Sequence, residues 1–87
     1  MFEKFSGSGQ CHICNRSIGT NGAEAYLISN ALFQLSKPFR QWIITNGLAT
    51  IENQSDYIFS RYSNPMGDQP VCFTCARDIL GVSPEYL

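Results

Sequence analysis

The 87-residue sequence lacks any apolar run of the roughly 18 residues that a membrane-spanning helix needs. Its first ten residues, MFEKFSGSGQ, contain neither the apolar core nor the cleavage site of a signal peptide. We therefore expect no membrane partner and a cytoplasmic location, which would be the host cytoplasm for a viral chain. Such a reducing compartment favours metal binding over disulfides where cysteines occur in pairs.

An excess of positive charge is also missing, because six lysines and arginines stand against seven acidic residues and the net charge is −1. Proteins that follow nucleic-acid phosphates usually carry a basic stripe. Binding to nucleic acid, as in a transcriptional regulator, is therefore disfavoured and stays as the alternative function. It would require the fold to bring together on one face Arg16, Lys37, Arg40, Arg61 and Arg77.

Catalytic signatures are absent as well, since the sequence has no GxSxG, P-loop, GxGxxG or HExxH motif. Its only histidine is His12, so a metal centre with several histidine ligands and a histidine general base cannot be assembled. We expect His12 to lie partly exposed without a chemical role, with metal ligation or proton transfer as alternatives. The sequence therefore predicts a protein that is not an enzyme.

The strongest positive signal is a set of four cysteines in two Cys-x-x-Cys pairs, with no cysteine left over. Four thiolates suit tetrahedral zinc, and each pair can supply two ligands from one tight turn. We predict one structural Zn²⁺ ion, bound by Cys11, Cys14, Cys72 and Cys75. A thiol redox protein is the third hypothesis, because a Cys-x-x-Cys pair before a helix also fits a reactive dithiol.

A long insert, residues 15–71, separates the two pairs, compared with the ~15–20 residues of a compact zinc ribbon. Within it, Ser36 as N-cap, Pro38 in the first turn and Gly47 after the end predict a helix over residues 37–46. The β-branched content of residues 41–45 leaves a strand open as the alternative.

The remaining elements are predicted from turn residues and aromatic content. The segment 31–35 is apolar but too short to assign. The other predictions are a hairpin turn at Asn21-Gly22, a strand at residues 25–29, a second strand at the aromatic-rich residues 57–62 and a turn at residues 64–68. A short helix is predicted to start at Cys75 or just before it and to continue through residues 76–80, where Gly81 can end it.

The two cysteine-containing segments resemble parts of treble-clef zinc fingers. The run Cys11-His12-Ile13-Cys14, followed by Arg16-Ser17-Ile18 and a glycine-containing turn, is similar to their zinc knuckle. The run from Cys72 to Leu80 is similar to the helix that closes their site. LIM and RING domains usually hold two zinc ions with eight ligands, whereas this chain has only four cysteines and one histidine. The resemblance is therefore to one half-site of such domains.

This resemblance implies an α+β fold: a small, zinc-stapled, treble-clef-like domain with an insert of a helix plus one or two strands between the cysteine pairs. We expect residues 1–10 to be a flexible N-terminal segment that becomes ordered only near Cys11, and residues 11–87 to be a single zinc-binding domain. Treble clefs occur in proteins of many functions, so the fold alone does not identify an activity.

The insert also carries aromatic residues, and we expect most of them to pack in the core: Phe33, Phe39, Trp42, Tyr57, Phe59 and Tyr62. If exposed, the partner-binding candidates are Trp42, Tyr57 and Tyr62, with Arg40 and Arg61 nearby. The sequence thus predicts a non-enzymatic, zinc-stabilised protein-interaction module. An adaptor, regulator or inhibitor fits this description, such as the small regulators of host machinery that bacteria and phages encode.

Overall fold

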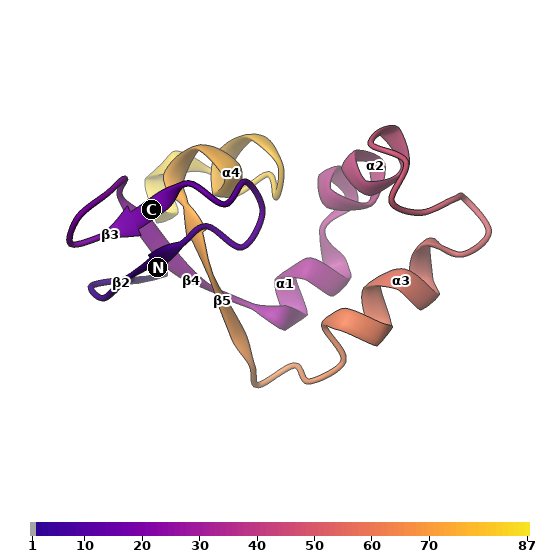
Figure 1. Cartoon of the computed structure of the whole chain (residues 1–87). Helices are drawn as coiled ribbons and strands as arrows, with labels where there is room; N and C mark the ends of the chain where they lie inside the picture. The colour runs from indigo at the N-terminus through magenta and orange to yellow at the C-terminus, as the bar shows by residue number, and fades with distance from the viewer. Residues whose placement is uncertain (1) are drawn as a thin grey trace.

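The computed structural model describes residues 2–87, which form a small α+β protein with two antiparallel sheets (Figure 1). In the three-stranded sheet, β4 (Ala25–Ser29) lies between β1 (Glu3–Lys4) and β5 (Asp68–Cys72). The register of β4 and β5 pairs Ala25 with Cys72 and Ser29 with Asp68. The predicted strand at residues 25–29 is confirmed as the central strand of this sheet.

The second sheet pairs β2 (Ser8–Gln10) with β3 (Ser17–Gly19), on either side of the first cysteine turn. Strands β1 and β2 thus lie within residues 1–10, where the sequence predicts order only near Cys11. Phe2 and Phe5 pack against the core here, and the Phe5 N–H donates to the Ala25 carbonyl at 2.9 Å. These apolar contacts give a physical reason for strand structure ahead of Cys11.

A turn occurs at the predicted Asn21-Gly22 position, but it does not join two strands of one hairpin. The strand before it, β3, pairs with β2, whereas the strand after it, β4, belongs to the other sheet. The expected hairpin is therefore wrong: β3 pairs with β2 on one edge, and on the other edge Ile18 meets Ala23 only in an isolated parallel bridge.

Three helices are inserted between β4 and β5, on the side of the molecule away from both chain ends (Figure 1). They are α1 (Asn30–Leu35), α2 (Lys37–Thr45) and α3 (Gln54–Arg61). The prediction of one helix plus one or two strands for the insert is therefore wrong in its number of helices. The segment 31–35, which the sequence left unassigned, lies in α1 and starts from the N-cap Ser29.

The predicted helix at residues 37–46 is confirmed as α2, and the alternative strand at residues 41–45 is wrong. The Ser36 hydroxyl accepts a hydrogen bond from the Phe39 N–H at 3.1 Å, as an N-cap does. The chain leaves the helix through Gly47, whose φ of 73° is the left-handed conformation that glycine adopts readily. Local signals therefore determine both ends of α2.

The predicted strand at residues 57–62 is wrong, because these residues belong mostly to α3. Ile58 and Tyr62, one helical turn apart, are 0% and 4% exposed and face the core together. Just before the helix, the Thr50 N–H donates to Asn53 Oδ1 at 2.8 Å, and the Asn53 N–H donates to Thr50 Oγ1 at 3.2 Å. These two bonds fix the backbone turn from which α3 starts. Packing of one helical face thus overrides the strand preference of an aromatic, β-branched segment.

After β5 the chain enters α4 (Phe73–Asp78) and ends with a short 3-10 helix, η1 (Pro84–Tyr86). The short helix predicted from Cys75 or just before it is confirmed as α4, which starts at Phe73 and ends at Asp78 rather than at Leu80. Gly81 follows it with a φ of 75°. The buried residues form one hydrophobic cluster that includes side chains from the sheet, from the helical part of the insert (α1–α3) and from the cysteine pairs. The insert and the cysteine site therefore share a core.

Candidate metal centre

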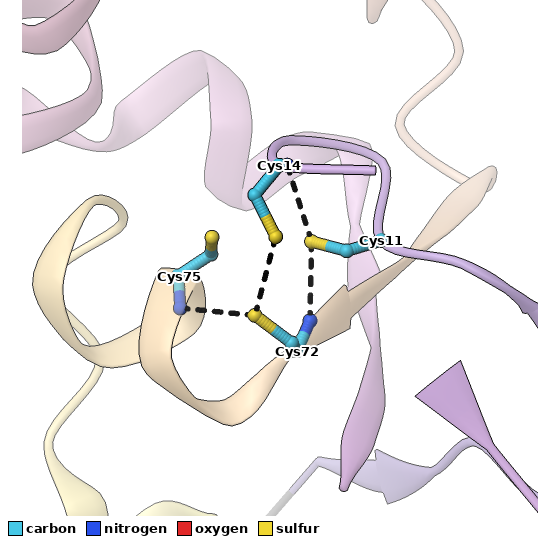
Figure 2. Close-up of side chains that lie close together, drawn as sticks. All are labelled: Cys11, Cys14, Cys72 and Cys75. Carbon is cyan, nitrogen blue, oxygen red and sulfur yellow. Dashed lines mark hydrogen bonds between the residues drawn. The ribbon is translucent and has the colours of Figure 1, made fainter. Parts of the chain in front are cut away.

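Four thiols from distant parts of the chain meet beside the start of α4 (Figure 2). Cys11 and Cys14 lie in the turn between β2 and β3, Cys72 ends β5, and Cys75 lies in α4. Their Sγ atoms all lie within 4.8 Å of one another, and none of the four cysteines is in a disulfide. Cys14 is exposed, whereas the other three are buried. The four cysteines predicted as ligands thus form one cluster.

Backbone amides point at two of these sulfurs. The N–H groups of Ile13, Cys14 and Cys72 lie 3.4, 3.5 and 3.4 Å from Cys11 Sγ. On the other side of the cluster, the Cys75 N–H lies 3.4 Å from Cys72 Sγ, which makes Cys72 the N-cap of α4. Such donors stabilise thiolates and hold them in position for a metal ion.

The exposed thiol has a positive neighbour, because Arg16 Nε lies 3.2 Å from Cys14 Sγ. Burial raises the pKa of Cys14, but hydrogen bonds from Arg16 and Cys11 outweigh it and lower that pKa to about 6. Burial raises the pKa of Cys72 and of Cys75, and contact with the neighbouring cysteines raises the latter further. Metal binding therefore has to displace protons from Cys72 and Cys75.

The sulfur atoms lie close enough together to bind one tetrahedral zinc ion. A Zn–S bond of about 2.3 Å in a tetrahedron places the sulfur atoms about 3.8 Å apart. Cys14 Sγ and Cys72 Sγ, one from each pair, are separated by 3.8 Å. Soft sulfur ligands in this arrangement select zinc or an iron–sulfur centre rather than magnesium or calcium. The four residues present can therefore hold a single metal ion such as zinc.

The only histidine lies beside this cluster but is not part of it. His12 Nε2 lies 2.9 Å from the Tyr62 hydroxyl, and the His12 ring meets Phe33 edge-on with centroids 5.8 Å apart. Partial burial lowers the pKa of His12. Its ring thus packs the cysteine turn against the insert, a contact that spacing in the sequence gave no reason to expect.

Most of the predicted partner-binding residues surround one pocket beside the metal centre. Trp42, Tyr57, Tyr62 and Arg61 all line it, although they come from different helices. Tyr62 is only 4% exposed and stacks on Phe33 with ring centroids 4.3 Å apart. Its ring is therefore part of the core, and only Trp42, Tyr57 and Arg61 of this group can reach a partner.

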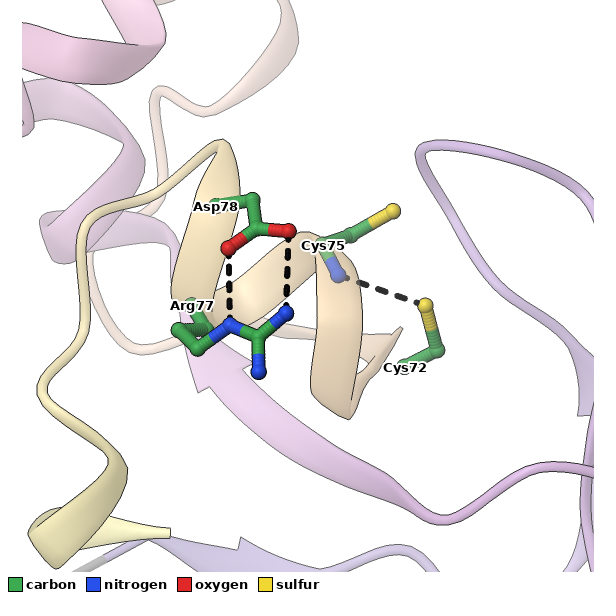
Figure 3. Close-up of polar contacts among 4 residues, drawn as sticks. All are labelled: Cys72, Cys75, Arg77 and Asp78. Atoms are coloured by element: carbon green, nitrogen blue, oxygen red, sulfur yellow. Dashed lines mark hydrogen bonds and ion pairs between the residues drawn. The ribbon is translucent and has the colours of Figure 1, made fainter.

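Other arginines make contacts within the chain itself. Arg40 does not line the pocket: it donates to the Gln34 carbonyl at 3.0 Å and to the Ser55 hydroxyl at 3.3 Å. Arg77 forms a two-point ion pair with Asp78, at 2.7 and 3.1 Å, on the side of α4 away from the cysteine sulfurs (Figure 3). The fold therefore separates Arg40 from the aromatic residues with which the sequence grouped it.

Sequence reasoning missed the contact between Arg16 and Cys14 and the pocket residues Ile13 and Leu48. The contact between Arg16 and Cys14 could have been predicted from the sequence, because a cation two residues after a predicted zinc ligand can reach that ligand's sulfur. Ile13 and Leu48 carried no such signal, since they approach each other only through the packing of α2 and α3 against the cysteine turn.

Across residues 2–87, no helix has both the length and the apolar character needed to cross a membrane. Comparison of the chain with protein-family models, with curated proteins and with solved structures finds no match. The sulfur cluster and the pocket beside it therefore carry the functional argument.

Proposed function

We propose that this chain is a small, zinc-stabilised protein-interaction module without catalytic activity, acting as an adaptor, regulator or inhibitor. The observation that carries the proposal is the four-sulfur cluster, whose geometry fits a closed structural zinc site with all ligands supplied by the protein. A closed site stabilises the fold and leaves no position for a substrate. The aromatic pocket beside it supplies the contact surface.

The arrangement of the thiols supports a metal site over the redox hypothesis. A catalytic dithiol needs one reactive pair, whereas here two pairs converge within 4.8 Å and both receive amide hydrogen bonds. A redox protein would leave the pair Cys11–Cys14 without a role.

The order of elements also supports a treble-clef-like architecture. The first cysteine pair lies in a turn, β4 and β5 form the antiparallel ribbon, and α4 carries the second pair at its start. In this proposal the three helices α1–α3 are an insertion at the tip of that ribbon, between Ser29 and Asp68.

Contacts of the arginines argue against the nucleic-acid alternative. That function needs Arg16, Lys37, Arg40, Arg61 and Arg77 free on one face. Instead, Arg16 contacts a cysteine sulfur, Arg40 binds within the insert, and Arg77 is paired with an acid. Protein contacts are therefore the better-supported function.

Native mass spectrometry provides the first test, on protein purified without added metal. One zinc ion per chain supports the structural site, and a mass lower by two or four protons without metal would instead indicate disulfides and overturn it. The second test is affinity capture from cells that naturally express the chain, with Trp42→Ala and the exposed control Phe59→Ala. We expect only Trp42→Ala to lose the partner while keeping its metal; a partner retained by both variants would contradict the proposed surface.

A further inference from the structure

A pocket of about 320 Å³ lies between the cysteine turn, α2 and α3. Phe39 and Tyr62, which are 2% and 4% exposed, form its floor. Trp42 and Tyr57 are half-buried beside it, and Leu48 is 47% exposed at its edge. The volume lies at the lower end of the roughly 300–1,000 Å³ range of ligand pockets, so it suits one large apolar group.

The pocket has one charged residue, Arg61, and no acidic residue in its lining. The Arg61 guanidinium lies 4.1 Å from the centroid of the Tyr57 ring. No ion pair within residues 2–87 includes Arg61. An exposed, unpaired cation at the edge of an apolar pocket is complementary to a ligand that carries a carboxylate next to its apolar group.

A second hollow lies next to the pocket, along α3. Leu48, Tyr57 and Arg61 line both hollows, and the second also has polar groups from Asn53 and Ser60. The second hollow also contains one acidic residue, Asp56, which disfavours a negative charge on the ligand at that end. A ligand that follows both hollows is longer than one ring and carries its negative charge near Arg61 rather than along its whole length.

We propose that these two neighbouring hollows, named here the α2–α3 groove, bind a short peptide segment of a partner protein. In this segment a large apolar side chain fills the pocket, an adjacent Asp or Glu pairs with Arg61, and uncharged residues follow along the second hollow. The proposal rests on the proposed function, because it specifies the partner's chemistry at the same surface. A rigid aromatic anchor beside a charge-assisted pair is a typical source of specific binding energy.

The test uses three blocked peptides, Gly-Phe-Glu-Gly-Gly, Gly-Phe-Gln-Gly-Gly and Gly-Phe-Lys-Gly-Gly, titrated into the zinc-loaded full chain. Trp42 is the only tryptophan, so its indole N–H gives one NMR resonance that reports on the pocket. We expect the Glu peptide to bind about tenfold more tightly than the Gln peptide, with the Lys peptide weakest. In Arg61→Gln the Glu and Gln peptides should bind equally, whereas the control Arg77→Gln should keep the difference.

Several outcomes would overturn the inference. Equal binding of the Glu and Gln peptides to the unaltered chain would show that the ligand's carboxylate has no role. A Trp42 resonance that does not shift with any of the three peptides would show that they do not bind in the α2–α3 groove. Binding of free 3-phenylpropanoate as tight as that of the Glu peptide would make the pocket a small-molecule site. If the peptides fail while a captured partner still depends on Trp42, the inference fails and the proposed function survives; if capture also fails, both are lost.

Discussion

At the scale of single residues, the exposed thiol of Cys14 has a neighbour that the other three sulfurs do not have. Arg16 Nε lies 3.2 Å from Cys14 Sγ, while Cys11 and Cys72 receive their hydrogen bonds from backbone amides. Backbone amides are held by the turn and by α4, but a side-chain donor can be removed without changing the fold. Arg16 is therefore the residue at which metal affinity can be altered separately from structure.

We predict that Arg16→Gln weakens zinc binding by about tenfold, the lower end of the range for groups that orient metal ligands, because Cys14 is exposed to water. Competition with a chromophoric chelator measures this change. Arg77→Gln removes the same charge at a distance from the sulfurs and should leave the affinity unaltered. Equal affinities for the two variants would show that the Arg16 contact has no role in holding the metal.

At the scale of the elements, the start of α2 is joined to the end of α4. The Ser36 hydroxyl caps α2 through the Phe39 N–H and donates to the Leu80 carbonyl at 2.8 Å. Gly81 packs against Pro38 in the first turn of α2. This α2–α4 junction, formed by Ser36, Pro38, Leu80 and Gly81, connects the insert to the helix that carries Cys75.

We predict that Ser36→Ala lowers the free energy of unfolding by about 2 kcal/mol, because it removes a cap and leaves the buried Leu80 carbonyl unpaired. Ser29→Ala removes the cap of α1 and a more exposed hydrogen bond to the Pro65 carbonyl at 3.2 Å, whose oxygen water can then reach, and should cost about 1 kcal/mol. Urea unfolding of the zinc-loaded variants measures both values. A cost for Ser36→Ala no greater than that for Ser29→Ala would mean that burial of the bond to Leu80 adds no stability.

The same junction predicts different costs for two glycine substitutions. Gly47 and Gly81 have similar φ values of 73° and 75°, so alanine at either is strained by about 1 kcal/mol. A Cβ at Gly47 meets nothing within 4 Å, whereas one at Gly81 lies 2.8 Å from Pro38 Cγ. We expect Gly81→Ala to cost about 1–3 kcal/mol more than Gly47→Ala in thermal or urea unfolding. Equal costs would contradict the close packing of α4 on α2.

Some elements could be predicted from the sequence because their signals are local. Ser36, Pro38 and Gly47 determine α2 within one segment, and the two Cys-x-x-Cys spacings are enough to predict the sulfur cluster. The strand predicted at residues 57–62 failed because its helical face is stabilised by burial of Ile58 and Tyr62, which the local sequence does not encode. The α2–α3 groove likewise exists only once α2 and α3 pack against the cysteine turn.

At the scale of the whole molecule, the metal centre and the insert are joined by packing as well as by the chain. His12 in the cysteine turn contacts both Phe33 and Tyr62 in the insert. The buried cysteines belong to the same hydrophobic cluster as these aromatic rings. Loss of the metal should therefore destabilise the helices α1–α3, although none of them carries one of the four cysteines.

We predict that a strong chelator unfolds the zinc-loaded protein in one cooperative step, because zinc binding in small domains contributes folding free energy directly. Trp42 lies in α2 and is the only tryptophan, so its emission reports on the insert, while far-UV circular dichroism reports on the whole chain. Both signals should change together and return when zinc is added back; a matched sample with chelator already saturated by zinc should not change. If Trp42 emission stayed constant as the metal left, the insert would be an independently stable unit. The shared core would then not couple the α2–α3 groove to the metal centre.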